Sequence, residues 1–407
     1  MPDATDDHIG ARIAEQRKLA HLTQRGLAQK AHVSFSLLSK VESGHRPASP
    51  AIVAACARAL GIESSVLVGQ PYAAEQRADR FDAPMAAIRA SLENWDVPLD
   101  SLTPPRPLEE IVKDVQGLGE DRRRADYLKT AAKAPALIDE LVEAAHRHEG
   151  TRQERAHRLL AYTYRCVHDV AYKLGHIDLG SSVLVRMSYS ADRSGDPYMV
   201  ILNSYLRAQS CFNTGRHDVG LRLMERSLAE VEENARRGDT SALCVQGNLR
   251  LRATMLAARQ RPGDKEQAET ARAQWREAWD TASQLGGDTQ NYVMSFGPSN
   301  TLIHKVALEV ELGNYGRAVK DAEDIHLPEE FGLAYPDRVS HYFIDLSRAQ
   351  LWTGDRQGAF ASLLKARAAA PQQTKFHPHV RETMAALRRA DRESGESLLH
   401  YARWLGL

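Results

Sequence analysis

Residues 22–47 read LTQRGLAQKAHVSFSLLSKVESGHRP, and this stretch decides the fold of the first part of the chain. Thr23 is a favourable N-cap for a short helix, and Ser34 is a favourable N-cap for the next one. Gly44 suits the end of the second helix, because glycine adopts positive φ at little cost. The sequence therefore predicts two short helices joined by a tight turn, with the outward side of the second helix available to a partner.

The flanking residues complete a small helical domain. Ile9 and Ile13 belong to the apolar stripe of a preceding helix, and a further helix is expected to begin with Ser49 as its N-cap. Arg17 falls on the same apolar stripe, and Glu42 lies at the inner edge of the second motif helix. A buried arginine is expected to be paired. We therefore predict an ion pair between Arg17 and Glu42.

Residues 8–68 resemble the lambda/Cro repressor-like (XRE-type) five-helix DNA-binding domain. The matching positions are Leu22-Thr23-Gln24, Leu27-Ala28, Ala31, Val33-Ser34, Leu38-Ser39, Glu42, Gly44 and Arg46-Pro47. The resemblance implies that the helix from Ser34 to Ser43 enters the major groove of double-stranded DNA. It also implies a homodimer that binds a pseudo-palindromic operator, because one such helix reads few bases alone.

Side chains on that helix offer chemistry for reading bases. Lys40 can donate to guanine acceptors, Ser36 can bond to several bases, and Phe35 can pack on a thymine methyl group. Alternatively, Phe35 only covers the turn and Lys40 only neutralises phosphate. The residues expected to bind DNA are Gln24, Arg25, Ser34, Phe35, Ser36, Ser39, Lys40, Ser43, His45 and Arg46.

Charge and cysteine usage set further limits. The chain has 407 residues, with 53 basic and 53 acidic side chains, and residues 1–70 hold eight Lys/Arg against six Asp/Glu. Nonspecific DNA affinity should therefore be modest, and dimer geometry must supply much of the tight binding.

The four cysteines are scattered without a C-x-x-C spacing, as is typical of core residues in a reducing compartment. The polar N-terminus and the lack of a long apolar run predict a cytoplasmic protein without a membrane partner.

From about residue 120 onward the sequence repeats a helical-hairpin pattern. Turn glycines at Gly175, Gly215, Gly313 and Gly354 each follow one amphipathic helix and precede another, and small residues recur where the paired helices would cross. This pattern resembles tetratricopeptide repeats. The longer interval between Gly215 and Gly313 leaves room for a further hairpin that turns near residues 261–264.

Three regions follow from these patterns. Residues 1–70 form the DNA-binding domain, residues 71–119 a helical and proline-rich connector, and residues 120–407 a tetratricopeptide-like α-solenoid that senses a signal or dimerises. The expected fold class is all-α. Prolines between residues 96 and 107 forbid a continuous helix there. This stretch is either an elbow that orients the two domains or a passive tether.

A solenoid of this kind presents a concave surface formed by the first helix of each pair. Aromatic, amide and charged side chains at the inward positions are typical of a site for a peptide or an amphipathic small molecule. The alternative is that these aromatic residues only pack between repeats. The expected ligand-binding residues are Tyr162, Arg165, Asp169, Tyr205, Gln209, Phe212, Asn300 and Arg348.

The combination of regions is similar to actinobacterial regulators and to peptide-sensing quorum-sensing regulators. The sequence thus predicts a transcription regulator controlled by a small molecule, a peptide or a partner protein bound to the repeats. The alternative is an interaction scaffold whose repeats hold a partner protein, with the helix-turn-helix recruiting it to DNA.

Enzyme and metal functions find little support. The sequence lacks a P-loop, a dinucleotide-binding glycine motif, a nucleophile elbow and a zinc-protease motif. His146 and His148 are two residues apart, so they would not face each other on a helix. His377 and His379 lie beside a proline without an accompanying Cys, Asp or Glu cluster. We therefore expect no catalytic residues, no cofactor and no metal.

Overall fold

The computed structural model describes residues 8–97, 104–261, 264–292, 294–390 and 396–407. Across these residues the chain is helical apart from one short β-hairpin, which confirms the predicted all-α class. Among the described helices, none has the length and apolar character needed to span a membrane.

The N-terminal domain, residues 8–70, contains five helices. They are α1 (Ile9–Leu19), α2 (Gln24–Lys30), α3 (Phe35–Glu42), α4 (Pro50–Leu60) and α5 (Ser64–Val68). The hydroxyls of Thr23, Ser34 and Ser49 accept hydrogen bonds from backbone N–H groups in the first turns of α2, α3 and α4, so the predicted N-caps are confirmed. Leu27 and Leu38 are completely buried in the core of the domain, where each contributes roughly 1.5–3 kcal/mol of hydrophobic stabilisation.

The predicted ion pair joins three of these helices. Arg17 Nε donates to Glu42 Oε1 at 2.8 Å, and Arg17 Nη2 donates to Glu42 Oε2 at 2.9 Å. The third guanidinium nitrogen, Nη1, donates to the Leu22 carbonyl at 2.9 Å, and Gln24 Nε2 donates to Glu42 Oε2 at 2.8 Å. The pair is therefore confirmed, and it forms the centre of a network that fixes α1 and α2 against α3.

Three helices link this domain to the rest: α6 (Ala73–Ala78), α7 (Asp82–Glu93) and α8 (Leu108–Arg123). Phe81 and Ile88 are buried in the same apolar cluster as Tyr164 of the following region. The described part of the connector around α7 is thus packed against the following region. Residues 98–103, which include part of the proline-rich stretch, lie outside the described residues. Helix α8 runs across the boundary expected at residue 119.

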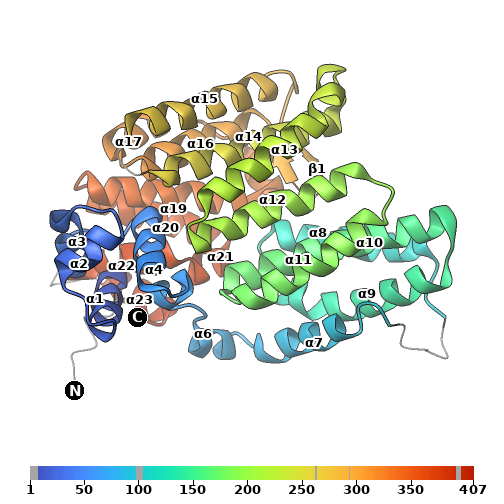
Figure 1. Cartoon of the computed structure of the whole chain (residues 1–407), viewed down its shortest axis with the longest axis horizontal. Coiled ribbons are helices and arrows are strands. Elements are labelled where there is room, and N and C mark those ends of the chain that lie inside the picture. The colour runs from blue at the N-terminus through green and yellow to red at the C-terminus, as the bar shows by residue number, and fades with distance from the viewer. Residues whose placement is uncertain (1–7, 98–103, 262–263, 293, 391–395) are drawn as a thin grey trace.

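The remaining helices form the helical stack (Figure 1). They are α9 (Tyr127–Arg147), α10 (Gly150–Leu174), α11 (Ile177–Asp192), α12 (Pro197–Thr214), α13 (His217–Arg236), α14 (Thr240–Gln260), α15 (Lys265–Ala282), α16 (Pro298–Glu311), α17 (Tyr315–Glu323), α18 (Glu329–Ala334), α19 (Pro336–Trp352), α20 (Arg356–Ala369), α21 (Pro371–Phe376), α22 (Pro378–Ala390) and α23 (Glu396–Leu405). Gly175, Gly215, Gly313 and Gly354 all have positive φ between paired helices, so the predicted turns are confirmed.

A β-hairpin between α15 and α16 was not predicted. It consists of the antiparallel strands β1 (Thr289–Asn291) and β2 (Met294–Phe296). The Phe296 ring lies so close to α14 that a Cβ at Gly247 would come within 1.8 Å of the ring. Strands of three residues are too short to produce a readable alternation of apolar and polar side chains.

The N-terminal domain lies against the helical stack, beside the C-terminal helices (Figure 1). Helices α4 and α5 contact α12, and α4 also contacts α14. At the opposite end of the chain, Glu382 of α22 accepts a hydrogen bond from the Ile9 amide at 3.2 Å. Segments that are 373 residues apart in sequence are therefore joined directly.

We predict that Arg17→Ala destabilises the N-terminal domain by roughly 3–5 kcal/mol, because Glu42 would be left buried without its cation. Faster amide hydrogen exchange in α1, α2 and α3 of the full chain would report this loss. Lys18→Ala is the control, since Lys18 lies on the same helix and is exposed. Equal exchange in the Arg17→Ala variant and the parent would contradict the prediction.

Candidate nucleic-acid interface and adjoining cavity

Helix α3 presents one side to the domain core and the other to solvent. Leu38 and Val41 are buried, whereas Ser36 and Lys40 are exposed and the Phe35 side chain is 45% exposed. The Phe35 ring therefore faces solvent rather than the domain core. The helix therefore offers an apolar ring, a hydroxyl and an ammonium group together.

The structure places the expected DNA-binding residues on or beside this surface. The exposed ones are Arg25, Ser34, Phe35, Ser36, Lys40, Ser43 and His45. The partly buried ones are Gln24, Ser39 and Arg46. Two of the latter have partners within the chain, since Gln24 donates to Glu42 and the Arg46 guanidinium lies 5.2 Å from the centre of the Trp352 ring. The Gln24 amide is thus engaged by Glu42 in this arrangement.

The other side of the N-terminal domain docks on helix ends of the helical stack. Arg58 Nη1 of α4 donates to the Gly215 carbonyl at 2.8 Å, and the Ser64 hydroxyl of α5 donates to the Asn213 carbonyl. Both acceptors lie at the C-terminus of α12, where backbone carbonyls lack partners within the helix and carry partial negative charge. The N-terminal domain therefore supplies the donors that this helix end requires.

Two further helix ends are satisfied in the same way. Gln70 Nε2 donates to the Phe376 carbonyl of α21 at 2.9 Å and lies 3.3 Å from the Lys173 carbonyl of α10. Gln76 Nε2 of α6 donates to the Leu174 carbonyl at 2.8 Å. The C-termini of α10, α12 and α21 thus converge on α4, α5 and α6, and side-chain donors hold the domain there.

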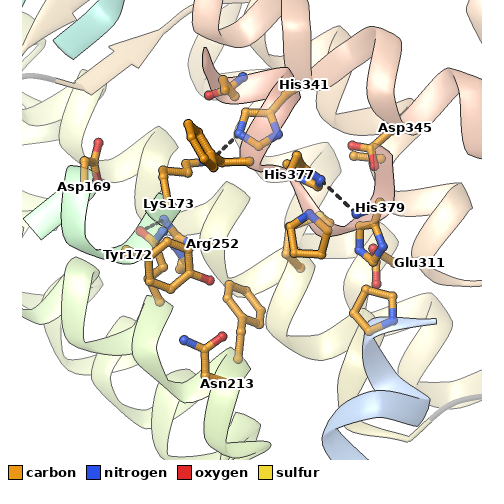
Figure 2. A pocket seen from close by; sticks show the side chains of 18 of the residues that line it. Asp169, Tyr172, Lys173, Asn213, Arg252, Glu311, His341, Asp345, His377 and His379 are labelled. Atoms are coloured by element: carbon orange, nitrogen blue, oxygen red, sulfur yellow. Dashed lines mark hydrogen bonds between the residues drawn. The ribbon is translucent and has the colours of Figure 1, made fainter. Parts of the chain in front are cut away.

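A cavity of about 320 Å³ lies where these elements meet, and Figure 2 shows part of its lining. The N-terminal domain contributes Val53 and Val68 among other residues, while α10, α12, α14, α16 and α19 form the facing walls. This volume is at the lower end of the roughly 300–1,000 Å³ that is usual for small-molecule sites. Its walls come from both domains, so an occupant would contact both at once.

Six of the expected ligand-binding residues line this cavity: Arg165, Asp169, Tyr205, Gln209, Phe212 and Arg348. Tyr162 and Asn300 are not among its lining residues. The Tyr162 ring stacks on Tyr292, with 6.4 Å between the ring centres, and Asn300 Nδ2 donates to the Ser295 carbonyl at 2.8 Å. Both partners belong to the β-hairpin or its turn, so the unpredicted hairpin occupies these two side chains.

A buried carboxylate on α10 is shared by two arginines. Arg122 Nε of α8 lies 2.6 Å from Asp169 Oδ2, and Arg165 Nη1 lies 2.5 Å from Asp169 Oδ1. Burial alone would raise the pKa of Asp169, but the two guanidinium groups hold it well below its usual value. Asp337, at 3.6 Å from Arg122 and 3.4 Å from Arg338, is shared in the same manner.

Two other cations that line the cavity, Lys173 and Arg252, have no carboxylate partner within 4.0 Å among the described residues. Lys173 Nζ lies 2.6 Å from His341 Nε2, the contact drawn in Figure 2, and burial lowers the pKa of Lys173 to about 7. The Arg252 guanidinium lies 4.2 Å from the centre of the Tyr205 ring and donates to Gln209 at 3.2 Å. Arg252 Nε has no described hydrogen-bond partner.

The opposite wall is balanced in charge. Arg259 pairs with Glu311 at 2.8 Å, and Arg348 pairs with Glu311 at 3.3 Å and with Asp345 at 3.1 Å. His377 also lines the cavity, and its pKa lies well below the usual value. Burial is the main cause, and the positive charge of Lys173 adds to it. Within the described ranges, no group of three or more His, Cys, Asp or Glu side chains is arranged to hold a metal ion.

Comparison with known proteins identifies one part of the chain. A sequence profile of the helix-turn-helix family matches residues 13–67, which run from the middle of α1 into the last turn of α5. No curated protein and no solved structure matches the chain. The match agrees with the capped helices, the exposed face of α3 and the Arg17–Glu42 pair. Residues 13–67 are therefore similar to the helix-turn-helix family, in agreement with the XRE-type resemblance, and a helical stack follows them.

Proposed function

We propose that this protein is a sequence-specific transcription regulator whose effector binds in the cavity between the N-terminal domain and the helical stack. The proposal is supported by the position of the N-terminal domain, which has one side in solvent and the other side at the cavity. Its α3 face is exposed, while α4 and α5 form a wall of the cavity. The same rigid unit can thus contact DNA on one side and report cavity occupancy on the other.

A small molecule suits this cavity better than a peptide or a partner protein. Solenoids usually hold partners on their concave surface, but here the N-terminal domain of the same chain contacts α12 and α14. The space that is left measures about 320 Å³, which suits a compact organic molecule. An extended peptide would have to displace the domain.

The regulator is proposed to bind a pseudo-palindromic operator as a homodimer. Residues 1–70 carry only a small excess of basic over acidic side chains, so phosphate contacts by one copy would give weak binding. Two copies of α3 that are held one helical turn of DNA apart would multiply both affinity and specificity. The helical stack would fix the distance between them.

The effector is proposed to favour the docked arrangement. A ligand shifts a conformational equilibrium only by its difference in affinity between the states. A molecule that contacts α4, α5 and the helical stack together gains those contacts only when the N-terminal domain is docked. Docking leaves α3 exposed and restricts its motion, so it lowers the entropy lost when the dimer binds both half-sites.

We predict that Ser36→Ala combined with Lys40→Ala weakens binding to the operator by at least about tenfold, because each good base contact contributes roughly 1–3 kcal/mol. A gel-shift titration on the upstream region of its own gene, at physiological salt, measures this change. Ser283→Ala with Lys320→Ala is the control, since both residues are exposed on the helical stack. Unchanged operator affinity in the Ser36→Ala/Lys40→Ala variant would show that α3 does not read the DNA.

We further predict that Arg58→Ala combined with Gln70→Ala lowers operator affinity, although neither side chain belongs to the α3 face. The variant removes the hydrogen bonds to the Gly215 and Phe376 carbonyls that hold the domain. The same titration measures the effect, with Arg237→Ala plus Gln284→Ala as the matched control on exposed positions. Affinity equal to that of the control would show that docking does not assist DNA binding.

A further inference from the structure

We infer that the cavity binds a small organic anion, a carboxylate or phosphate attached to an apolar ring or chain. Its acidic group is placed beside Arg165 and Arg252, two guanidinium groups of the cavity lining whose Nε atoms have no described hydrogen-bond partner. This inference rests on the proposed function, because it names the chemical class of the effector of that site.

The charge balance of the cavity supports an anion. Among the described residues, seven cationic side chains line the cavity against three carboxylates, and a fourth carboxylate, Asp337, pairs with two of these cations without lining the cavity. The cations are Arg122, Arg165, Lys173, Arg252, Arg259, Arg338 and Arg348, and the lining carboxylates are Asp169, Glu311 and Asp345. Charges removed from water are costly unless they are paired. A negatively charged occupant would supply the missing partner.

Unused hydrogen-bond donors mark the position of the acidic group. Arg165 is almost completely buried, and its Nε has no described hydrogen-bond partner. Arg252 Nε also lacks one, although the Arg252 guanidinium is held in place over the Tyr205 and Phe212 rings. Guanidinium groups fixed in this way are suited to carboxylate and phosphate oxygens, because their planar N–H groups match two oxygens at once.

The electrostatic potential at Tyr205 agrees with this position. Burial alone would raise the pKa of a tyrosine hydroxyl, as it does for Tyr172 in the same cavity. Burial also acts to raise the pKa of Tyr205, but the positive charges of Arg252, Arg338 and Arg165 outweigh it and lower that pKa below the usual value. The hydroxyl therefore lies in a strongly positive environment, which favours a negatively charged group beside it.

The rest of the cavity suits an apolar body. Phe212, Met255, Ile303 and Phe376 of the helical stack line it together with Val53 of the N-terminal domain. Apolar walls with a few converging polar groups are the usual composition of a small-molecule site. If the arginines hold the acidic group, the apolar body of the ligand is left to contact both the N-terminal domain and the helical stack. The proposed regulation by an effector requires contact with both.

The test compares ligands that share one ring and differ in charge. We predict that benzoate and phenyl phosphate bind the full-length protein at millimolar concentrations in calorimetric titrations. Neutral benzamide and cationic benzylamine should bind at least about tenfold more weakly, because a hydrogen bond to a charged group contributes roughly 1.5–3 kcal/mol. Benzoate bound more tightly than phenyl phosphate would identify a carboxylate effector, and the reverse order a phosphate.

Arg252→Met should reduce benzoate binding to the level of benzamide. Arg250→Met is the matched control on the same helix, because Arg250 pairs with Glu277 and does not line the cavity. Equal binding of benzoate and benzamide, no binding of any ligand, or full benzoate binding by Arg252→Met would each overturn the inference. The operator titration separates this failure from failure of the proposed DNA binding, since it reads α3 without any added ligand.

Lys173 provides an independent readout from the free protein. The charged and titratable groups around it are Asp169, Arg122, Asp337, Arg338, His341 and His377. Because its pKa is lowered from 10.5 to about 7, the unfolded chain binds this proton more tightly than the folded protein does. The contribution of Lys173 therefore destabilises the fold most below pH 7, and stability recovers as the pH rises from about 7 to 10.5.

We predict that Lys173→Met raises the melting temperature of the ligand-free protein, more at pH 6 than at pH 9, and weakens benzoate binding. Lys320→Met is the control, since Lys320 is exposed on α17. A purely structural lysine would behave differently, because its loss would lower the melting temperature. A lowered melting temperature of Lys173→Met, or unchanged benzoate binding, would contradict an anion site beside Lys173.

Discussion

The arrangement of the molecule depends on three helix ends that need hydrogen-bond donors. The C-terminal carbonyls of α10, α12 and α21 converge on one place, and the N-terminal domain with α6 supplies Arg58, Ser64, Gln70 and Gln76 to them. Buried carbonyls without donors are costly, so these contacts fix which side of the domain faces inward. The exposed face of α3 follows from this constraint, and so does the cavity that remains beside α4 and α5.

A second constraint acts against stability. The cavity wall brings Lys173 and Arg252 close to other cations without giving them carboxylates, whereas the opposite wall is balanced by Glu311 and Asp345. A protein selected only for stability would replace such unpaired cations with apolar side chains of similar volume. Unbalanced charge in a cavity between two domains is instead typical of a binding site, where stability is sacrificed to ligand recognition.

Much of the fold could be predicted because its signals are local. The caps at Thr23 and Ser34, the Arg17–Glu42 pair and the glycine turns each depend on short motifs or on a known spacing. The cavity could not be assembled in this way. Arg122 lies in a charge run, Asp121 to Asp126, which is ordinarily a solvated helix face, and only the packing of α8 against α10 brings it to Asp169. The β-hairpin, too short to leave a periodic signal, occupies Tyr162 and Asn300, which sequence spacing alone assigns to the concave surface.

The central claim is that the N-terminal domain is held by the helical stack with α3 outward. The most direct test is a distance measurement by pulsed electron paramagnetic resonance between spin labels at Lys30→Cys on α2 and Lys320→Cys on α17. Both positions are exposed, and the four native cysteines are buried. We predict a distribution dominated by one narrow distance in the full-length protein. A broad distribution, as expected for a domain that moves freely on its connector, would contradict it.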